Sequence, residues 1–384
     1  MKKKLAFVDL TNYKDWPMGG MLEYELSILP IMAERFEIDL WGFSVDGVKP
    51  KPLIMNGKEY PIHIFGNSNT GKRIIPNFYR GANIINFKSS MDKYDVVYCH
   101  SGSCAVGAHF AMSSHSKLVY HQHGLNYLDD YHLSSLIQRP FYFFGQKFAD
   151  LVLVVSDAPS VAKYAFQRKK YTDAKYVAIG SPIDLNKFDE VLNNKKILER
   201  GNKDANKFIY TGRLSKYKNV RTLVSAFDLY VKNGHPDAIL NIAGDGEELD
   251  LLNSMKKELG IMNNVNILGK VAHDDIYKLL SDSDVFLTAS GGEGCSVSVL
   301  EAYASGLPVI CGKVRGLEGQ VINNETGLFV DEISAKGIYD AMVKLNNNIK
   351  NISLGALRIA KKYDRQIIAN KICDEIDTLF RLEI

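Results

Sequence analysis

The sequence predicts an α/β protein built from two doubly wound domains. Short apolar segments alternate with longer helical segments along the whole chain, which is typical of parallel sheets covered by helices. The length of 384 residues exceeds what one hydrophobic core normally organises, and this indicates two domains. A polar stretch rich in Lys, Asn and Asp, residues 186–206, separates the two halves and has the composition of a linker.

The apolar segments have the length and composition of buried strands. In the first half they are Lys4–Asp9, Glu37–Phe43, Val96–Cys99, Lys117–His121, Leu151–Val155 and Tyr176–Ile179, and in the second half Lys207–Thr211, Ala238–Ala243, Val265–Leu268, Val285–Thr288, Pro308–Ile310 and Leu328–Val330. The last segment, Ser353–Leu382, has a helical pattern with a break near Lys362–Asp364.

These segments set the expected domain boundaries. We expect an N-terminal Rossmann-like domain over residues 1–185, a linker over 186–206 and a C-terminal Rossmann-like domain over 207–360, followed by a C-terminal helix over 361–384. Two doubly wound domains that face one another place a cleft at the carboxyl ends of their strands.

Composition restricts the possible partners and location. The 47 Lys and Arg residues nearly balance the 44 Asp and Glu residues, so the net charge of +3 does not support nucleic acid as a partner. The basic start of the chain is followed by Leu5–Val8 and then Asp9, too short for a signal peptide. No stretch approaches the roughly 20 apolar residues that span a bilayer. Five cysteines without a Cys-x-x-Cys pair are typical of reduced thiols, so we expect a soluble, cytoplasmic protein.

The most informative segment contains two carboxylates, Glu293 and Glu301, eight positions apart between an apolar strand and the strand Pro308–Ile310. The spacing predicts a loop that carries Glu293 and a helix that carries Glu301. Backbone N–H groups at the helix start, around Cys295–Val297, form an anion site. Amide donors for a phosphate beside carboxylates for hydroxyls suit a sugar attached to a nucleoside diphosphate.

Other strand ends of the second half carry candidate ligand contacts. Gly212 allows close backbone approach, and the cations Arg213 and Lys218 can converge on a diphosphate, although a Lys-rich loop alone is more often only solvated. The turn at Gly244 is a weaker candidate border of a nucleotide, and backbone groups near Val271 are candidates for reading a base edge.

In the first half, Gly19 and Gly20 lie between the first strand and the following helix. They allow backbone N–H groups to approach a phosphate or sugar, or they serve only a tight turn. His121 and His123 close a strand, where histidine can bind sugar or phosphate oxygens or move protons. A zinc site at this pair lacks a third ligand at a recognisable spacing, and we expect one of the two to point into the sheet as a structural residue.

Two aromatic segments raise the question of a membrane contact. The cluster Pro140–Phe144 is expected to be the buried face of the helix before Leu151. The basic, aromatic segment Lys72–Lys93 suits an anionic membrane face or an acceptor with a lipid phosphate, and equally an ordinary surface helix.

The motifs together match a known family. Glu293-x7-Glu301 followed by Ala302-x-Ala304-x-Gly306-x-Pro308, with Gly212-Arg213-Leu214-x3-Lys218-Asn219 upstream, resembles the retaining glycosyltransferases of family 4. The resemblance covers nearly the whole chain, including Gly19-Gly20 and His123-Gly124, although the loop Val314–Gln320 lacks the family's usual double glycine. It implies the GT-B fold, in which the two Rossmann-like domains face across a cleft and the C-terminal helix crosses back to the first domain.

The resemblance also implies residue roles. Arg213 and Lys218 would neutralise the donor diphosphate, Glu293 would hold the sugar hydroxyls and Glu301 the ribose hydroxyls. The remaining implied donor contacts are the backbones of Cys295, Ser296 and Val297, Gly20 at the diphosphate and His123 at the sugar. No divalent metal and no cofactor are expected, because the two cations take that role.

The resulting hypothesis is a hexosyl- or N-acetylhexosaminyltransferase that uses a UDP- or GDP-linked sugar. The acceptor would be a glycan or lipid-linked glycan in bacterial surface polysaccharide synthesis, with peripheral contact to the inner face of the membrane. Two alternatives remain open: a nucleotide-sugar epimerase or hydrolase on the same fold, and a non-catalytic nucleotide-sugar-binding subunit.

Overall fold

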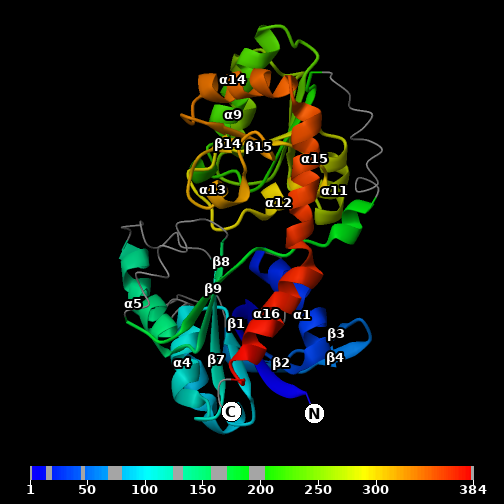
Figure 1. Ribbon diagram of the computed structural model, residues 1–384. Coiled ribbons are helices and arrows are strands. Elements are labelled where there is room, and N and C mark those ends of the chain that lie inside the picture. Colours follow the sequence, from blue (N-terminus) through cyan, green and yellow to red (C-terminus); the bar gives the residue numbers. More distant parts are fainter. Residues whose placement is uncertain are drawn as a thin grey trace. The chain divides into compact units, whose positions relative to one another are not determined.

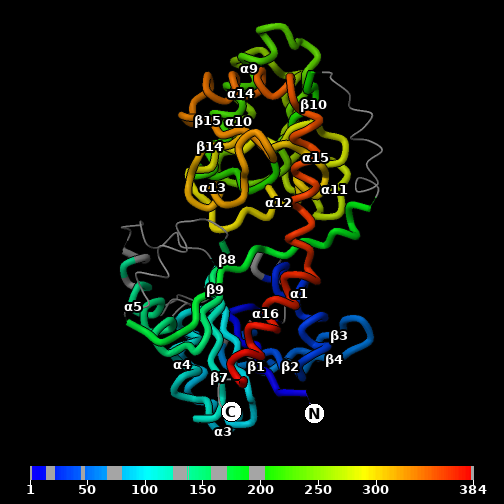
Figure 2. Tube along the Cα trace, in the orientation of Figure 1, coloured from blue at the N-terminus to red at the C-terminus, as the bar shows by residue number. Residues whose placement is uncertain are grey.

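The structure is a computed structural model that describes residues 2–13, 20–44, 48–67, 80–123, 133–156, 171–189 and 204–381. The chain forms two compact α/β units, which Figures 1 and 2 show in colours that follow the sequence. We call residues 1–182 with 365–384 the N-terminal unit and residues 183–364 the C-terminal unit. The chain therefore passes from one unit to the other between residues 182 and 183 and again between 364 and 365. The sequence predicted these boundaries between 185 and 186 and between 360 and 361.

The N-terminal unit is built on a seven-stranded parallel sheet in the order β5-β2-β1-β6-β7-β8-β9. Its strands are nearly continuous apolar runs because helices cover a parallel sheet on both faces. The strands are β1 Lys3–Asn12, β2 Phe36–Ser44, β5 Ile62–Asn67, β6 Val96–Cys99, β7 Lys117–Gln122, β8 Leu151–Val155 and β9 Lys175–Ile179. The helices are α1 Gly20–Arg35, η1 Gly81–Phe87, α3 Lys88–Met91, α4 Gly102–Ala111, α5 Leu133–Phe148 and α16 Arg365–Thr378.

Three strands of this unit are absent from the sequence-based expectations. Strands β3 (Leu53–Met55) and β4 (Lys58–Tyr60) form an antiparallel hairpin, and β5 continues the main sheet. The hairpin turn is Asn56-Gly57, whose φ angles of 51° and 73° are both positive. Asn-Gly between apolar residues is a strong hairpin signal, so the sequence did contain the information needed to predict it.

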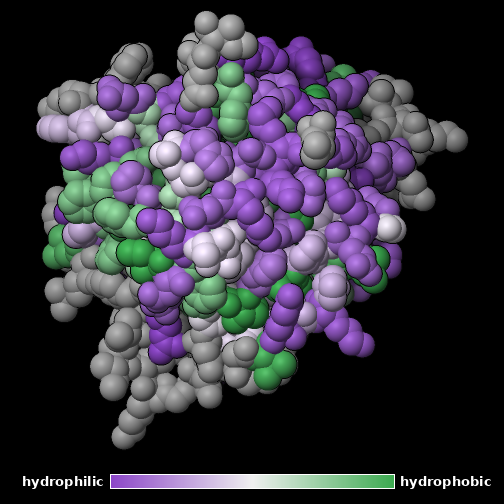
Figure 3. All heavy atoms as spheres, turned by 90° about the horizontal axis from the view of Figure 1, so that it is seen from below, coloured by the Kyte–Doolittle hydropathy of each residue, from purple (hydrophilic) through white to green (hydrophobic). Residues whose placement is uncertain are grey.

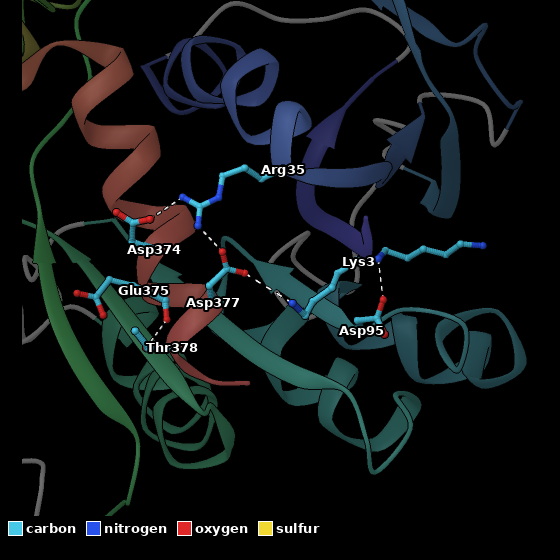
Figure 4. Close-up of polar contacts among 8 residues, drawn as sticks. Lys3, Arg35, Asp95, Asp374, Glu375, Asp377 and Thr378 are labelled. Carbon is cyan, nitrogen blue, oxygen red and sulfur yellow. Dashed lines mark hydrogen bonds and ion pairs between the residues drawn. The ribbon is translucent and has the colours of Figure 1, made fainter. Parts of the chain in front are cut away.

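The last helix belongs to the N-terminal unit, and ion pairs fix it there. Arg35, at the end of α1, reaches Asp374 at 2.6 Å and also pairs with Asp377 (Figure 4). Lys3 of β1 lies 3.7 Å from the same Asp377. The helix is separated from α15 by the short turn η5 (Lys361–Tyr363), which confirms the expected break.

The C-terminal unit contains a six-stranded parallel sheet in the order β12-β11-β10-β13-β14-β15. Its strands are β10 Lys207–Thr211, β11 Ile239–Ala243, β12 Val265–Gly269, β13 Val285–Leu287, β14 Val309–Gly312 and β15 Gly327–Val330. Its helices are η3 Leu185–Phe188, η4 Lys216–Lys218, α9 Val220–Lys232, α10 Leu249–Glu258, α11 His273–Ser281, α12 Val297–Ala304, α13 Leu317–Gln320, α14 Ala335–Asn346, α15 Ile349–Ala360 and η5. Phe188 of η3 is buried in the core of this unit, so the expected linker begins inside it.

Each sheet has a position at which the strand order reverses. In the N-terminal sheet β1 lies between β2 and β6, and in the C-terminal sheet β10 lies between β11 and β13. The loops that leave two neighbouring strands at such a point diverge, and this leaves a crevice at the carboxyl edge. The two switch points are therefore where a ligand site is expected within each unit.

The surface of the N-terminal unit includes an aromatic patch. The face in Figure 3 is mostly hydrophilic, with hydrophobic residues at the left, the side on which α4 and α5 lie in Figure 1, and also along its lower centre. Phe110 of α4 and Phe144 of α5 are 54% and 42% exposed, and both contact the ring of Phe148. The expectation that the aromatic cluster Pro140–Phe144 is a buried face is therefore wrong for Phe144.

The structure also bears on the expectations about membrane-spanning helices, the basic segment Lys72–Lys93 and the cysteines. None of the helices in the described ranges combines the length and apolar character needed to cross a bilayer. Of the basic segment Lys72–Lys93, residues 72–79 lie outside the described residues, and the remainder forms η1 and α3, where Ile84 is buried and Ile85 is 46% exposed. All five cysteines are free thiols, as expected.

Candidate functional site

The predicted residues of the second half gather at the switch point of the C-terminal sheet. Residues 212–219 follow β10, and residues 288–296 follow β13, the neighbouring strand. A third loop, residues 313–316, follows β14. These three loops leave adjacent strands at the same edge, because all the strands run parallel.

The first two loops are joined by an ion pair between Lys218 and Glu293. The ammonium Nζ of Lys218 donates to Oε1 of Glu293 at 2.5 Å, and the two side chains are only 26% and 15% exposed. Arg213, in the same loop, is exposed. A half-buried pair of opposite charges is more strongly coupled than a solvated one, since less water screens it. The site thus presents a cation and a carboxylate side by side.

Two glycines allow these loops to approach one another closely. A Cβ at Gly244 would lie 1.8 Å from the carbonyl oxygen of Gly212, so only glycine fits where the β10 and β11 loops meet. Gly316 has a φ of +87°, and a Cβ there would lie 2.1 Å from the Glu293 carbonyl oxygen. The Glu293 N–H also donates to the Arg315 carbonyl at 2.9 Å. The third loop therefore fixes the backbone that carries Glu293.

The start of α12, predicted as an anion site, is already partly occupied by a side chain. The Ser296 N–H donates to Oε1 of Gln320 at 2.7 Å, and Nε2 of Gln320 donates to the Ser296 carbonyl and to Sγ of Cys295, both at 3.2 Å. Gln320 is buried at the end of α13. The Ser296 N–H is thus not the free donor that the sequence predicted. Val297, the third residue of the predicted anion site, is the first residue of α12.

Glu301 has a partner that the sequence did not indicate. Its Oε1 lies 2.7 Å from Nε2 of His273, the first residue of α11, and Nδ1 of His273 lies 3.2 Å from the Tyr277 hydroxyl. The Glu301 side chain is only 7% exposed. Val271, predicted as a base contact, is half-buried two residues before His273. This contact between α11 and α12 orients the carboxylate.

In the N-terminal unit, the predicted residues lie near the other switch point. Gly19 lies outside the described residues, and Gly20 is the first residue of α1. His123 directly follows β7 and is half-buried. His121 is fully buried in β7, where Nδ1 lies 2.5 Å from the Tyr98 hydroxyl, so it is the structural member of the pair.

A third histidine joins this pair. Nδ1 of His100, which directly follows β6, lies 2.7 Å from Nε2 of His123. Burial lowers the pKa of His123 to about 4, and burial together with the neighbouring imidazoles lowers the pKa of His100 and His121 well below the usual value. The three rings are therefore neutral at pH 7.

Sequence reasoning missed His100, His273 and Gln320 for different reasons. His100 stands directly after a predicted strand, and His123 stands just after the next predicted strand. The position of His100 at a strand end could therefore have indicated it from the sequence. His273 and Gln320 stand in segments with no pattern of their own, and only the packing of α11 and α13 against α12 and its N-terminal loop brings them to the site.

Comparisons with known proteins indicate the class of protein to which this chain is similar. Residues 193–367 match the family described as glycosyl transferases group 1. The chain is 26% identical over 293 residues to the UDP-Gal:alpha-D-GlcNAc-diphosphoundecaprenol alpha-1,3-galactosyltransferase of Escherichia coli, covering 71% of this chain and 74% of that protein.

Solved structures show the same fold. Anabaena Alr3699/HepE in complex with UDP superposes with a TM-score of 0.72 at 20% identity, covering 98% of this chain and 100% of that one. Sucrose-phosphate synthase from Thermosynechococcus elongatus gives a TM-score of 0.77 at 18% identity, covering 99% and 100%. The fold is GT-B, with two parallel-sheet α/β units. With residues 193–367 matching the glycosyl transferases group 1 model and with relatives over most of the chain named as glycosyltransferases, the chain is a glycosyltransferase.

Proposed function

We propose that this enzyme transfers a hexose or N-acetylhexosamine from a nucleoside-diphosphate sugar to an acceptor hydroxyl, with retention of anomeric configuration, as in glycosyltransferase family 4. The observation that carries the proposal is the Lys218–Glu293 pair at the switch point of the C-terminal sheet. A cation stabilises a bound diphosphate, and a carboxylate accepts hydrogen bonds from sugar hydroxyls. Lys218 supplies the cation and Glu293 the carboxylate, and a hydrogen bond joins the two side chains.

The proposed reaction assigns each charge a task. Lys218 and Arg213 hold the donor diphosphate and stabilise the negative charge that grows on it as the bond from the anomeric carbon to the phosphate oxygen breaks. Glu293, released from Lys218, accepts hydrogen bonds from sugar hydroxyls. The acceptor oxygen bonds to the anomeric carbon, and its proton passes to the departing phosphate oxygen. No divalent metal takes part, because the two cations supply the positive charge.

The nucleotide is proposed to be held by Glu301. Its carboxylate, oriented by His273, suits the two hydroxyls of a ribose. We favour uridine over guanosine as the base, since the E. coli relative is named for UDP-Gal and the Anabaena structure contains UDP. Gly20 and His123 remain predictions that rest on the family resemblance.

The proposed acceptor is a lipid-linked glycan in bacterial surface polysaccharide synthesis. The name of the E. coli relative specifies a sugar on diphosphoundecaprenol as its acceptor. An acceptor of this kind is anchored in a bilayer, so the proposal includes peripheral contact with the inner face of the membrane. The exposed rings Phe110 and Phe144 support such contact, because apolar side chains on a protein surface can insert into the boundary between headgroups and acyl chains.

The experiment is a donor panel of UDP- and GDP-linked hexoses and N-acetylhexosamines, incubated with and without a short glycan on a lipid diphosphate. We expect acceptor-dependent product from a UDP-sugar, with the donor's anomeric configuration in the product by NMR. Rapid complete turnover of donor alone would favour an epimerase or hydrolase. Tight nucleotide binding without turnover of any donor would favour a non-catalytic subunit.

A further inference from the structure

Three histidines converge at the carboxyl edge of the N-terminal sheet, a set to which the proposed reaction assigns no common task. His100 follows β6, and His121 and His123 lie at the end of β7, the next strand in the sheet. One ring nitrogen of each lies within 4.8 Å of the others. We propose that His100, His121 and His123 form a binding site for a Zn²⁺ ion.

The arrangement of the three rings matches ligands around one ion. The ring centroids are 5.0, 5.1 and 4.8 Å apart, which is nearly an equilateral triangle, whereas a linear stack would make one distance about twice the others. With Zn–N bonds of about 2.0–2.1 Å at tetrahedral angles, three imidazoles have centroids about 5 Å apart. The interplanar angles of 24°, 37° and 25° suit rings that spread outward from one point.

Burial provides an independent argument. Nε2 of His100 and Nε2 of His121 are buried and have no hydrogen-bond partner among the residues that the structure describes. Buried polar atoms are nearly always satisfied by protein, by water or by an ion, since an unsatisfied one costs free energy. Because Nδ1 of His121 is engaged by the Tyr98 hydroxyl, its unpartnered Nε2 is the nitrogen that points to a bound species, whereas His100 would bind through Nδ1 and its Nε2 does not bear on the argument.

The present hydrogen bond indicates what changes when the ion binds. Nδ1 of His100 and Nε2 of His123 are 2.7 Å apart, whereas two nitrogens bound to one tetrahedral zinc lie about 3.3 Å apart. Binding thus replaces this hydrogen bond by two metal bonds and separates the rings by roughly half an ångström. Rotation about the side-chain bonds of the half-buried His123 can supply that change.

The ligand chemistry selects the class of ion. Imidazole nitrogens favour Zn²⁺ and neighbouring transition metals, whereas Mg²⁺ and Ca²⁺ require a set of oxygen ligands. A carboxylate is near as well, since Oε1 of Glu25 lies 3.9 Å from Nδ1 of His100. The pair His121 and His123 gave no zinc prediction from sequence because the third ligand stands on the preceding strand. An ion at this site would engage the imidazole that the family resemblance assigns to the donor sugar, so it would act as an inhibitor.

The test uses Co²⁺ as a spectroscopic probe for Zn²⁺ on the metal-stripped full-length protein, without nucleotide or acceptor. We expect one Co²⁺ per chain with visible d–d absorption that an equimolar amount of Zn²⁺ abolishes. His100→Gln and His123→Gln should each weaken binding by at least about 10–100-fold, the effect of losing even a second-shell partner. The matched control His115→Gln, an exposed histidine of the same unit, should bind as the parent protein does.

Three results would overturn the site. They are no visible absorption in the parent protein, unchanged binding in both glutamine variants, and a sulfur-to-cobalt charge-transfer band that disappears in Cys295→Ser. If circular dichroism shows that His100→Gln does not fold, metal binding by His123→Gln tests the site, since His123 is only half-buried. Because no substrate is present, failure here leaves the transferase proposal standing.

Discussion

Lys218 and Glu293 stand 75 positions apart in the chain, yet their side chains form an ion pair with 2.5 Å between Nζ and Oε1. The two residues follow β10 and β13, which are neighbours only because the strand order reverses between them. The pair therefore holds a cation and a carboxylate together at the carboxyl edge of the C-terminal sheet.

Replacing Lys218 by Ala tests the phosphate role. We expect kcat/KM to fall by about 10²–10³, the cost of removing one group that stabilises charge in the transition state. Lys216→Ala is the matched control, because Lys216 lies exposed in the same loop and should retain activity near the parent value. Equal activity of Lys218→Ala and the parent enzyme would exclude the diphosphate role.

His273 is expected to act through Glu301 on nucleotide affinity. His273→Ala and Glu301→Gln should each weaken UDP binding by about tenfold, with a smaller effect on kcat, because a ribose contact is made equally in the ground state and the transition state. Calorimetry on the double variant should show that the two losses are not additive, since the residues are in direct contact. Additive losses would mean that His273 does not position the carboxylate.

Chelation tests the metal-free reaction. With EDTA in excess, the rate of sugar transfer should stay at or above its untreated value, since the proposed charges on the diphosphate come from Arg213 and Lys218. The measurement is the initial rate before and after dialysis against chelator, with the same donor and acceptor. Loss of activity that Mg²⁺ or Mn²⁺ restores would contradict the proposed reaction.

Asp39 gives a prediction on acid stability. Burial raises its pKa, but contacts with His63, Tyr94 and Lys93 outweigh burial and lower it to about 2. A carboxyl group whose pKa is lower in the folded state stabilises the fold above its unfolded pKa of about 3.9, and this contribution is lost as the pH falls toward 2.

Asp39→Asn should therefore lower the free energy of unfolding by about 1–3 kcal/mol at pH 7, with the difference shrinking below about pH 4. Urea unfolding of both proteins between pH 7 and pH 3 measures this. Asp92→Asn, at an exposed position of the same unit, is the control. A difference that does not change with pH would show that lost packing, and not the charge, causes the effect.

The aromatic patch on α4 and α5 gives a prediction on membrane contact. Phe110→Ser with Phe144→Ser should reduce binding to vesicles that contain anionic lipid by about tenfold, because each exposed ring contributes apolar area that leaves water. Leu354→Ser, at a residue 39% exposed on α15, is the control for a general loss of surface hydrophobicity. Equal flotation of all three proteins with the vesicles would remove the patch from the proposal.

Local signals were enough to predict most of the sheet. Strands such as Val96–Cys99 and Leu151–Val155 are buried on both faces, so their sequences are continuous apolar runs that are visible without a structure. Phe144 was misplaced for the opposite reason: an aromatic side chain has the same local signature whether it is in a core or on an exposed patch. The hairpin at Asn56-Gly57 also has a local signal, because Asn-Gly favours the positive φ angles of a tight turn.

The sequence by itself predicted the glycosyltransferase class, because the motifs that resemble the family are short: Arg213 with Lys218, and Glu293 with Glu301. Local spacing fixes such motifs wherever the strands place them. Only the tertiary structure decided which of these groups are partners. Parallel strands that are distant in sequence bring their carboxyl ends to one edge, so Lys218 meets Glu293 and His100 meets His123. The packing of α11 and α13 against α12 and its N-terminal loop brings His273 to Glu301 and Gln320 to the Ser296 N–H. The contacts between strand ends depend on strand order, and strand order is set by the packing of the whole unit.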